Sequence, residues 1–203
     1  MKKVIAISLL LFLFVSISNA QVGKMSVQPD VVIALPIGDF SDFANVGFGA
    51  TGTFLYRVID QLDLTGTVGF LTFGTKTPSL PAGTPSGSSI DASGSFRTIP
   101  VMFGARYYFV KGAVMPYGAA ELGLHFTSSS DIDITYNNGF QTVKQTVPGS
   151  SDSNFGFGFG GGAVFQANSN LMLNGELKFN IISTSGNSSN YLSVQGGVLF
   201  SLN

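Results

Sequence analysis

A few side chains have the chemistry for catalysis or metal binding, and His125 comes first because it is the only histidine in the chain. Glu121 stands four residues earlier, and a carboxylate beside an imidazole can act in acid/base catalysis. Asp131 and Asp133 follow, and two carboxylates in one loop could bind a cation. A lone histidine without a nucleophile is weak support for an enzyme, so a structural role for His125 is preferred. We therefore expect no enzyme, no catalytic residues, no metal site and no cofactor.

The glycine-rich stretch 156–162 is the other feature that could bind a ligand. A phosphate-binding loop needs a following Lys-Ser or Lys-Thr and a helix, and neither follows here. Glycine also relieves crowding where a backbone packs closely, which is the interpretation we prefer.

Composition narrows the class of protein. Only 10% of the 203 residues are charged, against about 25% in soluble domains. The 10 basic and 11 acidic residues exclude a polybasic nucleic-acid binder and an acidic disordered tail. The absence of Cys excludes a disulfide scaffold and a Cys-based zinc site.

The N-terminus resembles an export signal. Lys2 and Lys3 precede the apolar run 4–15, and the small residues Ser18-Asn19-Ala20 form a cleavage site. A 12-residue apolar helix is about 18 Å long, too short for a bilayer core of about 30 Å. We predict a signal peptide over 1–20 and one mature domain over 21–203.

The apolar residues of that domain alternate with polar ones, which indicates β-strands. In 170–182, for example, Leu173 and Leu177 alternate with Asn174, Glu176 and Lys178. Eight such segments are found, at 25–35, 46–56, 62–73, 95–109, 115–126, 154–165, 170–182 and 191–202. After 115–126 the same alternation runs on through Ile132, Ile134 and Tyr136.

The connections between these segments alternate in length. Three are short, at 59–61, 110–113 and 167–169, and four are longer, at 36–45, 76–94, 137–153 and 183–190. Outer-membrane barrels have short periplasmic turns and long extracellular loops. We predict an all-β fold, an eight-stranded antiparallel up-and-down transmembrane β-barrel with its polar faces inward and its apolar faces toward lipid.

A barrel of eight strands has an interior that side chains can fill. The inward faces carry a set of polar side chains: Asp30, Asp63, Arg106, Glu121, His125, Glu176 and Lys178. Arg106 and Glu121 lie on adjacent strands joined by a short turn, so they can face each other. We interpret this set as a structural ion-pair network, since buried charges need partners. A polar pore or gate is the alternative.

Aromatic residues at outward positions near strand ends are expected to form girdles at the membrane interfaces. Tyr56, Tyr107, Phe109 and Phe165 mark the periplasmic side, and Phe48, Phe70 and Phe155 mark the outer side.

Several motifs resemble small outer-membrane β-barrel proteins of the OmpA/OmpX-like type in Gram-negative bacteria. They are 35–42, starting Leu-Pro-Ile-Gly-Asp, the segments 97–101 and 104–109, and Pro116-Tyr117-Gly118. The resemblance covers 21–203 and implies the fold and a porin-like place in the cell envelope, but no activity. Such chains commonly end on an aromatic residue, whereas this one ends on Leu202-Asn203 after Phe200, which weakens the assembly signal. His125-Phe126-Thr127 also faintly resembles the His-x-Ser element of lipid A deacylases, with Thr in place of Ser.

Three functions fit these features. The first is a structural or surface-interaction barrel in the outer membrane, with the loops 76–94 and 137–153 as contact surfaces. The second is a narrow pore, or a binder or transporter of small hydrophobic molecules. The third is a soluble, lipocalin-like periplasmic barrel. The expected partners are outer-membrane lipid and lipopolysaccharide, the barrel assembly machinery and an extracellular ligand, but no nucleic acid.

Overall fold

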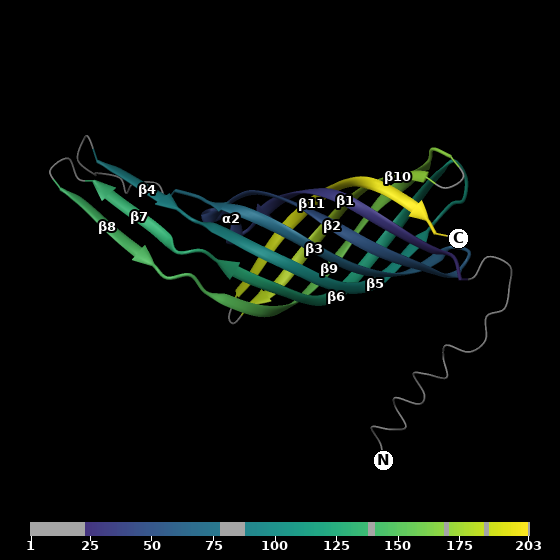
Figure 1. Cartoon of the computed structure of the whole chain (residues 1–203), viewed down its shortest axis with the longest axis horizontal. Helices are drawn as coiled ribbons and strands as arrows, with labels where there is room; N and C mark the ends of the chain where they lie inside the picture. Colours follow the sequence, from purple (N-terminus) through teal and green to yellow (C-terminus); the bar gives the residue numbers. More distant parts are fainter. Residues whose placement is uncertain (1–22, 78–87, 138–140, 169–170, 185–186, 203) are drawn as a thin grey trace, which may run out of the picture.

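Eight long antiparallel strands close into a barrel, as the sequence predicts (Figure 1). The computed structural model describes residues 23–77, 88–137, 141–168, 171–184 and 187–202. The barrel strands are β1 (Met25–Ile37), β2 (Ala44–Ile59), β3 (Leu62–Thr75), β5 (Ser95–Tyr108), β6 (Val114–Ser129), β9 (Ser151–Gln166), β10 (Leu171–Thr184) and β11 (Asn187–Ser201). Each pairs with its neighbour along the chain, and β1 pairs with β11 to close the cylinder. The predicted signal peptide over 1–20 lies outside the described residues and stays a prediction, as does the domain over 21–203.

The barrel strands place polar side chains inside and apolar side chains outside, which is the reverse of a soluble barrel. On β10, Asn174, Glu176 and Lys178 are at most 6% exposed, whereas Leu173 and Leu177 are 48% and 54% exposed. Because a strand alternates its side chains, a polar interior places the apolar residues outside. A soluble lipocalin-like barrel requires the opposite arrangement, so that alternative is wrong.

One end of the barrel carries the short turns. Residues 60–61 join β2 to β3, and residues 109–113 join β5 to β6. β1 begins and β11 ends at the same level, because Ser26 pairs with Ser201. Lys111 Nζ donates to Asp60 Oδ2 at 2.5 Å across two of these turns, and this hydrogen bond lowers the pKa of Asp60. We call this end the short-turn end.

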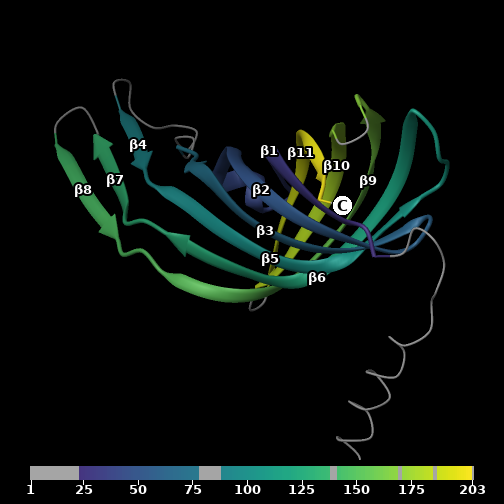
Figure 2. The same cartoon turned by 45° about the vertical axis from the view of Figure 1, so that its right-hand side comes forward.

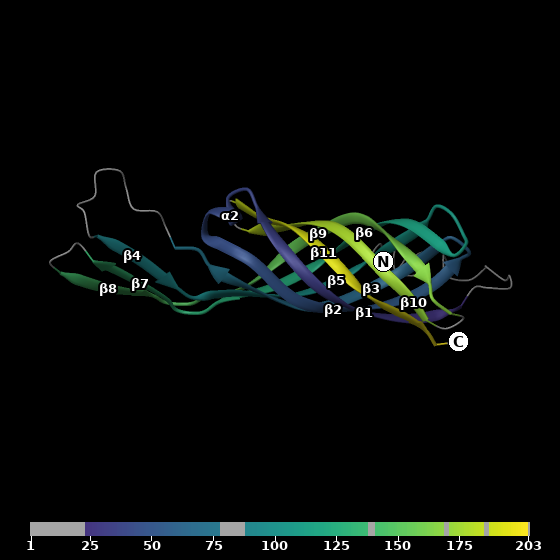
Figure 3. The same cartoon turned by 90° about the horizontal axis from the view of Figure 1, so that it is seen from above.

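The opposite end is more compact than the sequence suggests on two connections. In the segment 36–45, β1 continues to Ile37 and a short helix, α2 (Phe40–Phe43), follows at the mouth of the barrel (Figure 3). In the segment 183–190, β10 and β11 remain paired up to Thr184 and Asn187, so this connection is a hairpin and not an eight-residue loop. Within the described residues, no helix is long and apolar enough to cross a membrane.

Segments of the other two long connections form a second sheet together with residues 132–137. The strands β4 (Ser89–Ser93), β7 (Ile132–Asn137) and β8 (Thr142–Val147) pair in the order β4-β7-β8 and project beyond the mouth (Figures 1 and 2). We call this sheet the extension. The sequence alternation predicts one strand through Tyr136, but Ser130-Asp131 separates β6 from β7, and β7 leaves the barrel sheet. Residues 78–87 and 138–140 of the predicted loops 76–94 and 137–153 lie outside the described residues.

Candidate functional site

The centre of the barrel holds a chain of four charged side chains. Lys178 Nζ lies 2.9 Å from Glu121 Oε2 and 3.8 Å from Glu176 Oε1. Arg106 Nη2 lies 3.6 Å from Glu176 Oε2. All four side chains are at most 7% exposed, so contacts within the group replace the water that would otherwise surround each charge. Strands β5, β6 and β10 contribute these residues, and we call the group the lumen network.

Amide and hydroxyl groups extend the network toward the short-turn end. Arg106 Nη1 donates to Gln28 Oε1 at 2.7 Å, and Gln28 Nε2 donates to Asp30 Oδ2 at 2.7 Å. Asn174 Nδ2 donates to Asp30 Oδ1 at 3.0 Å, while Asn174 Oδ1 and Glu176 Oε2 share the one hydroxyl proton of Tyr117. The Tyr117 ring also lies 4.1 Å beneath the Arg106 guanidinium. These contacts cross the barrel interior, so they fix the strands against one another.

Asp63 does not join the lumen network. It accepts hydrogen bonds from Arg57 Nε at 2.7 Å and from Arg57 Nη2 at 3.0 Å, nearer the short-turn end. Such a bidentate arrangement is among the stronger ion-pair geometries in proteins.

His125 is fully buried but does not form an acid/base pair. Its Nδ1 lies 3.4 Å from Thr98 Oγ1, and its ring packs edge-on against Tyr191. Glu121 instead bonds to Lys178 and accepts from Thr67 Oγ1 at 3.0 Å. No group of three His, Asp or Glu side chains in the described part of the chain could hold a metal ion. His125 therefore has the surroundings of a packed side chain.

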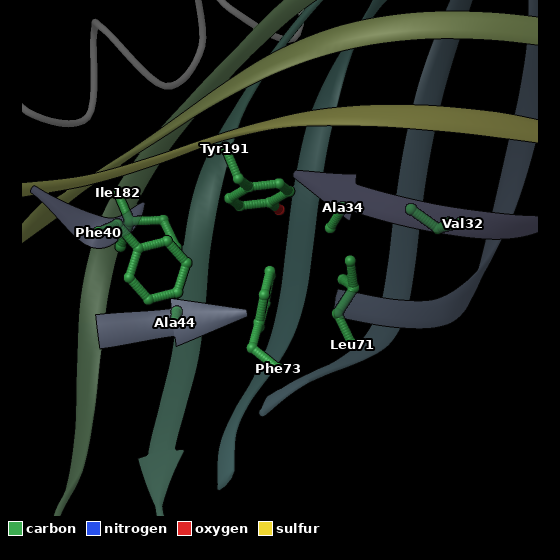
Figure 4. Packing of buried hydrophobic residues seen from close by; sticks show 8 residues of the cluster. All are labelled: Val32, Ala34, Phe40, Ala44, Leu71, Phe73, Ile182 and Tyr191. Carbon is green, nitrogen blue, oxygen red and sulfur yellow. The ribbon is translucent and has the colours of Figure 1, made fainter. Parts of the chain in front are cut away.

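Apolar clusters close the barrel at both ends. At the outer mouth, Phe40 of α2 packs among buried side chains from five strands, with its ring centroid 5.1 Å from that of Phe73 (Figure 4). At the short-turn end, Tyr108, Tyr117 and Val164 form a second cluster. Between the clusters, a cavity of about 20 Å³ beside Glu121 and Lys178 has room for about one water molecule.

All seven predicted lumen residues are buried inside the barrel, but their partners differ from those that the sequence suggests. Arg106 and Glu121 form no ion pair with each other. The strand register sets Arg106 opposite Ala119 and Glu121 opposite Gly104, so each reaches a β10 side chain instead. The predicted network omits Gln28, Asn174 and Tyr117, although they share the inward faces of Asp30, Glu176 and Glu121, respectively.

The predicted girdle residues lie on the outer surface of the barrel. Their exposed fractions run from 44% for Tyr107 to 58% for Phe48 and Phe109, and Tyr56 is half-buried. Tyr107 and Phe109 contact each other at the short-turn end, with ring centroids 5.8 Å apart. Their role at a membrane interface stays a prediction.

The extension has one polar face and one apolar face. Cross-strand partners share a face, and Ile90, Tyr136 and Val143 form one such row. Ala92, Ile132, Ile134 and Val147 share this apolar face, on which Gln145 is the one polar residue among them. The opposite face carries Asp91, Thr135, Lys144, Asp133 and Thr146. Val143 is 55% and Val147 is 40% exposed, so no described residue covers the outer part of the apolar face.

Comparisons with known proteins agree on this architecture. The family model "Outer membrane protein beta-barrel domain" matches residues 7–200. Comparison with curated proteins finds no match. Among solved structures, OprG of Pseudomonas aeruginosa has a TM-score of 0.55 at 15% identity, covering 93% of this chain and 100% of that one. Neisserial surface protein A has a TM-score of 0.54 at 19% identity, covering 88% and 97%. A major outer membrane protein of Thermus thermophilus has a TM-score of 0.53 at 15% identity, covering 88% and 99%. At these identities the structures show a shared fold.

Proposed function

Because the chain belongs to the family of outer membrane protein β-barrel domains and lies in the outer membrane, we propose that it acts at the cell surface by contact with other molecules. The barrel is the anchor, and the extension is the contact surface. Lipid and lipopolysaccharide surround the apolar exterior in this proposal, and the barrel assembly machinery inserts the chain. Catalysis and conduction form no part of it.

The observation that carries the proposal is the bare apolar face of the extension. A three-stranded sheet in water normally buries one face against something else. Here Val143 and Val147 remain open to solvent, and no described strand pairs with the outer edge of β8, whose backbone donors and acceptors a partner strand can use. Both features are typical of a surface that associates with another molecule.

The lumen supports the same proposal. A conducting barrel needs a continuous water-filled path, and the lumen network with its two apolar clusters fills the interior. The narrow pore, one form of the second function suggested by the sequence, therefore has no support in this geometry.

Two substitutions on neighbouring residues test the contact surface. Val143 and Thr142 are adjacent, exposed and on opposite faces of β8, so Val143→Asp and Thr142→Asp add the same charge to different faces. Cells that produce the protein are passed over octyl-agarose, a defined apolar surface. We expect Val143→Asp to reduce retention toward that of cells without the protein, and Thr142→Asp to retain cells like wild type. Equal retention for both variants would overturn the proposed role of this face.

A further inference from the structure

The outer mouth contains a cavity of about 190 Å³ that the lumen network does not fill. It lies between α2 on one side and the outer ends of β5, β6 and β9 on the other. We call it the mouth cavity. Its two walls differ in chemistry.

Four phenylalanines form the apolar wall. Phe40 lies at the centre, with ring centroids 5.6 Å from Phe43, 5.1 Å from Phe73 and 6.4 Å from Phe96, all edge-on. Phe73 is only 2% exposed and Phe40 only 8%, so packing against the barrel holds their rings in place. An apolar cavity of about 150 Å³ in a protein core is large enough to bind benzene. The mouth cavity is thus large enough for one aromatic ring with a short polar substituent.

Hydrogen-bonding groups form the second wall. Thr98 and Thr127 contribute hydroxyls, and Asn154 donates its Nδ2 to Thr127 Oγ1 at 3.1 Å. That bond leaves the Asn154 amide oxygen able to accept from a ligand. Asp152 lies two residues before Asn154 on β9, so its carboxylate is on the same inward face of the strand.

The charge of this wall is negative. Among the described residues, Asp152 has no ion-pair partner within 4.0 Å. Arg97 also lines the cavity, but it lies on the same face of β5 as Ile99, which faces outward. Lys76, the cation beside α2, donates to the Ser41 carbonyl at 3.2 Å. A ligand with a positive, hydrogen-bond-donating end therefore complements this wall.

We propose that the mouth cavity binds a small aromatic amine. The ring lies against Phe40, Phe43 and Phe96, and the ammonium group donates to Asp152 and to the Asn154 amide oxygen. A carboxylic acid of the same size meets the Asp152 carboxylate and is disfavoured. This inference is independent of the contact role of the extension, because it uses none of the residues on the apolar face of the extension.

The test uses the full refolded chain in lipid nanodiscs and three fluorinated probes followed by fluorine NMR. The probes are 4-fluorobenzylamine, 4-fluorobenzyl alcohol and 4-fluorophenylacetate, which share a ring and differ in charge. Empty nanodiscs correct for partition into lipid. We expect saturable binding of the amine at least about fivefold tighter than the acid, the size of one partly exposed charge contact.

Two variants and one control locate the site. Asp152→Asn should bring the amine and the acid within about twofold of each other and leave the alcohol unchanged. Phe96→Ala should weaken all three probes, whereas Phe157→Ala, on the lipid-facing side of β9, should weaken none. Asp152 is exposed, so we expect Asp152→Asn to fold. This variant keeps the test decisive even if Phe96→Ala fails to fold. No saturable binding, or an amine preference that survives Asp152→Asn, would overturn the proposal.

Discussion

Lys178 is the residue on which the lumen network depends most, because it lies between two buried carboxylates. Replacing it with Met keeps the length of the side chain and removes the charge. Glu121 then loses its only cation, and Glu176 keeps Arg106 alone within the described residues. Breaking a buried ion pair from one side costs about 3–5 kcal/mol, so we expect Lys178→Met to lower the free energy of unfolding by that amount.

Urea unfolding in lipid vesicles, followed by circular dichroism, measures this loss. Lys144→Met is the matched control, because Lys144 is exposed on the extension and its loss should change stability by less than about 0.5 kcal/mol. Adding Glu121→Gln to Lys178→Met should recover part of the loss, because it removes the unpaired charge. Equal stabilities for Lys178→Met and Lys144→Met would contradict the network.

For a single residue, the sequence predicts whether the side chain faces the lumen or the outside, but not which side chains it contacts. Alternation alone places Arg106, Glu121 and Lys178 inward. Their partners depend on the stagger between strands and on contacts across the lumen, such as that of Arg106 with Gln28, 78 positions apart in the sequence. No local pattern contains that information.

Among the elements, β9 shows how small residues permit a closed barrel of eight strands. A Cβ placed on Gly156 would lie 2.3 Å from the His125 ring carbon Cδ2, and His125 is fully buried and cannot move aside. We expect Gly156→Ala to destabilise the barrel by about 1–3 kcal/mol through overpacking. The same substitution in a His125→Ala background should cost clearly less.

A double-mutant cycle on unfolding free energies measures this coupling. Gly175→Ala is a suitable control, because a Cβ on Gly175 has open space around it. If Gly156→Ala cost as much with His125 absent as with it present, the glycines of β9 would need another explanation.

The eight barrel strands could be predicted because each keeps a period of two over its length, whereas the extension could not. The alternation of β6 and β7 is compatible with one long strand, but at Ser130-Asp131 the register slips by one residue. Phe96 pairs with Ser129, and Ser93 pairs with Asp133. A slip of this kind depends on the partner strand, so a single-strand pattern does not reveal it.

For the whole molecule, the filled interior predicts no conductance. The refolded protein in a planar bilayer should give no discrete current steps at voltages where a wide porin, run as the positive control, conducts. The reason is that the lumen network and both apolar clusters occupy the path. Regular current steps from the purified protein would contradict a closed lumen.

The closure of the barrel follows from the sequence, but the plugs at its ends do not. Leu71 and Tyr191 hold inward positions that the alternation assigns to polar residues, yet both are only 2% exposed within the outer cluster. In the sequence, a single apolar residue at an inward position is only an exception to the alternation of polar and apolar residues. Only the shared position of several such residues at one level of the barrel makes them a plug.

The most direct test of the central claim, a barrel with its extension outside the cell, is labelling of single cysteines in intact cells. The chain has no native Cys, so Lys144→Cys on the extension and Lys111→Cys at the short-turn end each give one reactive site. With a membrane-impermeant maleimide, Lys144→Cys should react in intact cells, and Lys111→Cys only after the outer membrane is broken. Labelling of Lys111→Cys in intact cells, with Lys144→Cys protected, would contradict the topology and the proposed role of the extension.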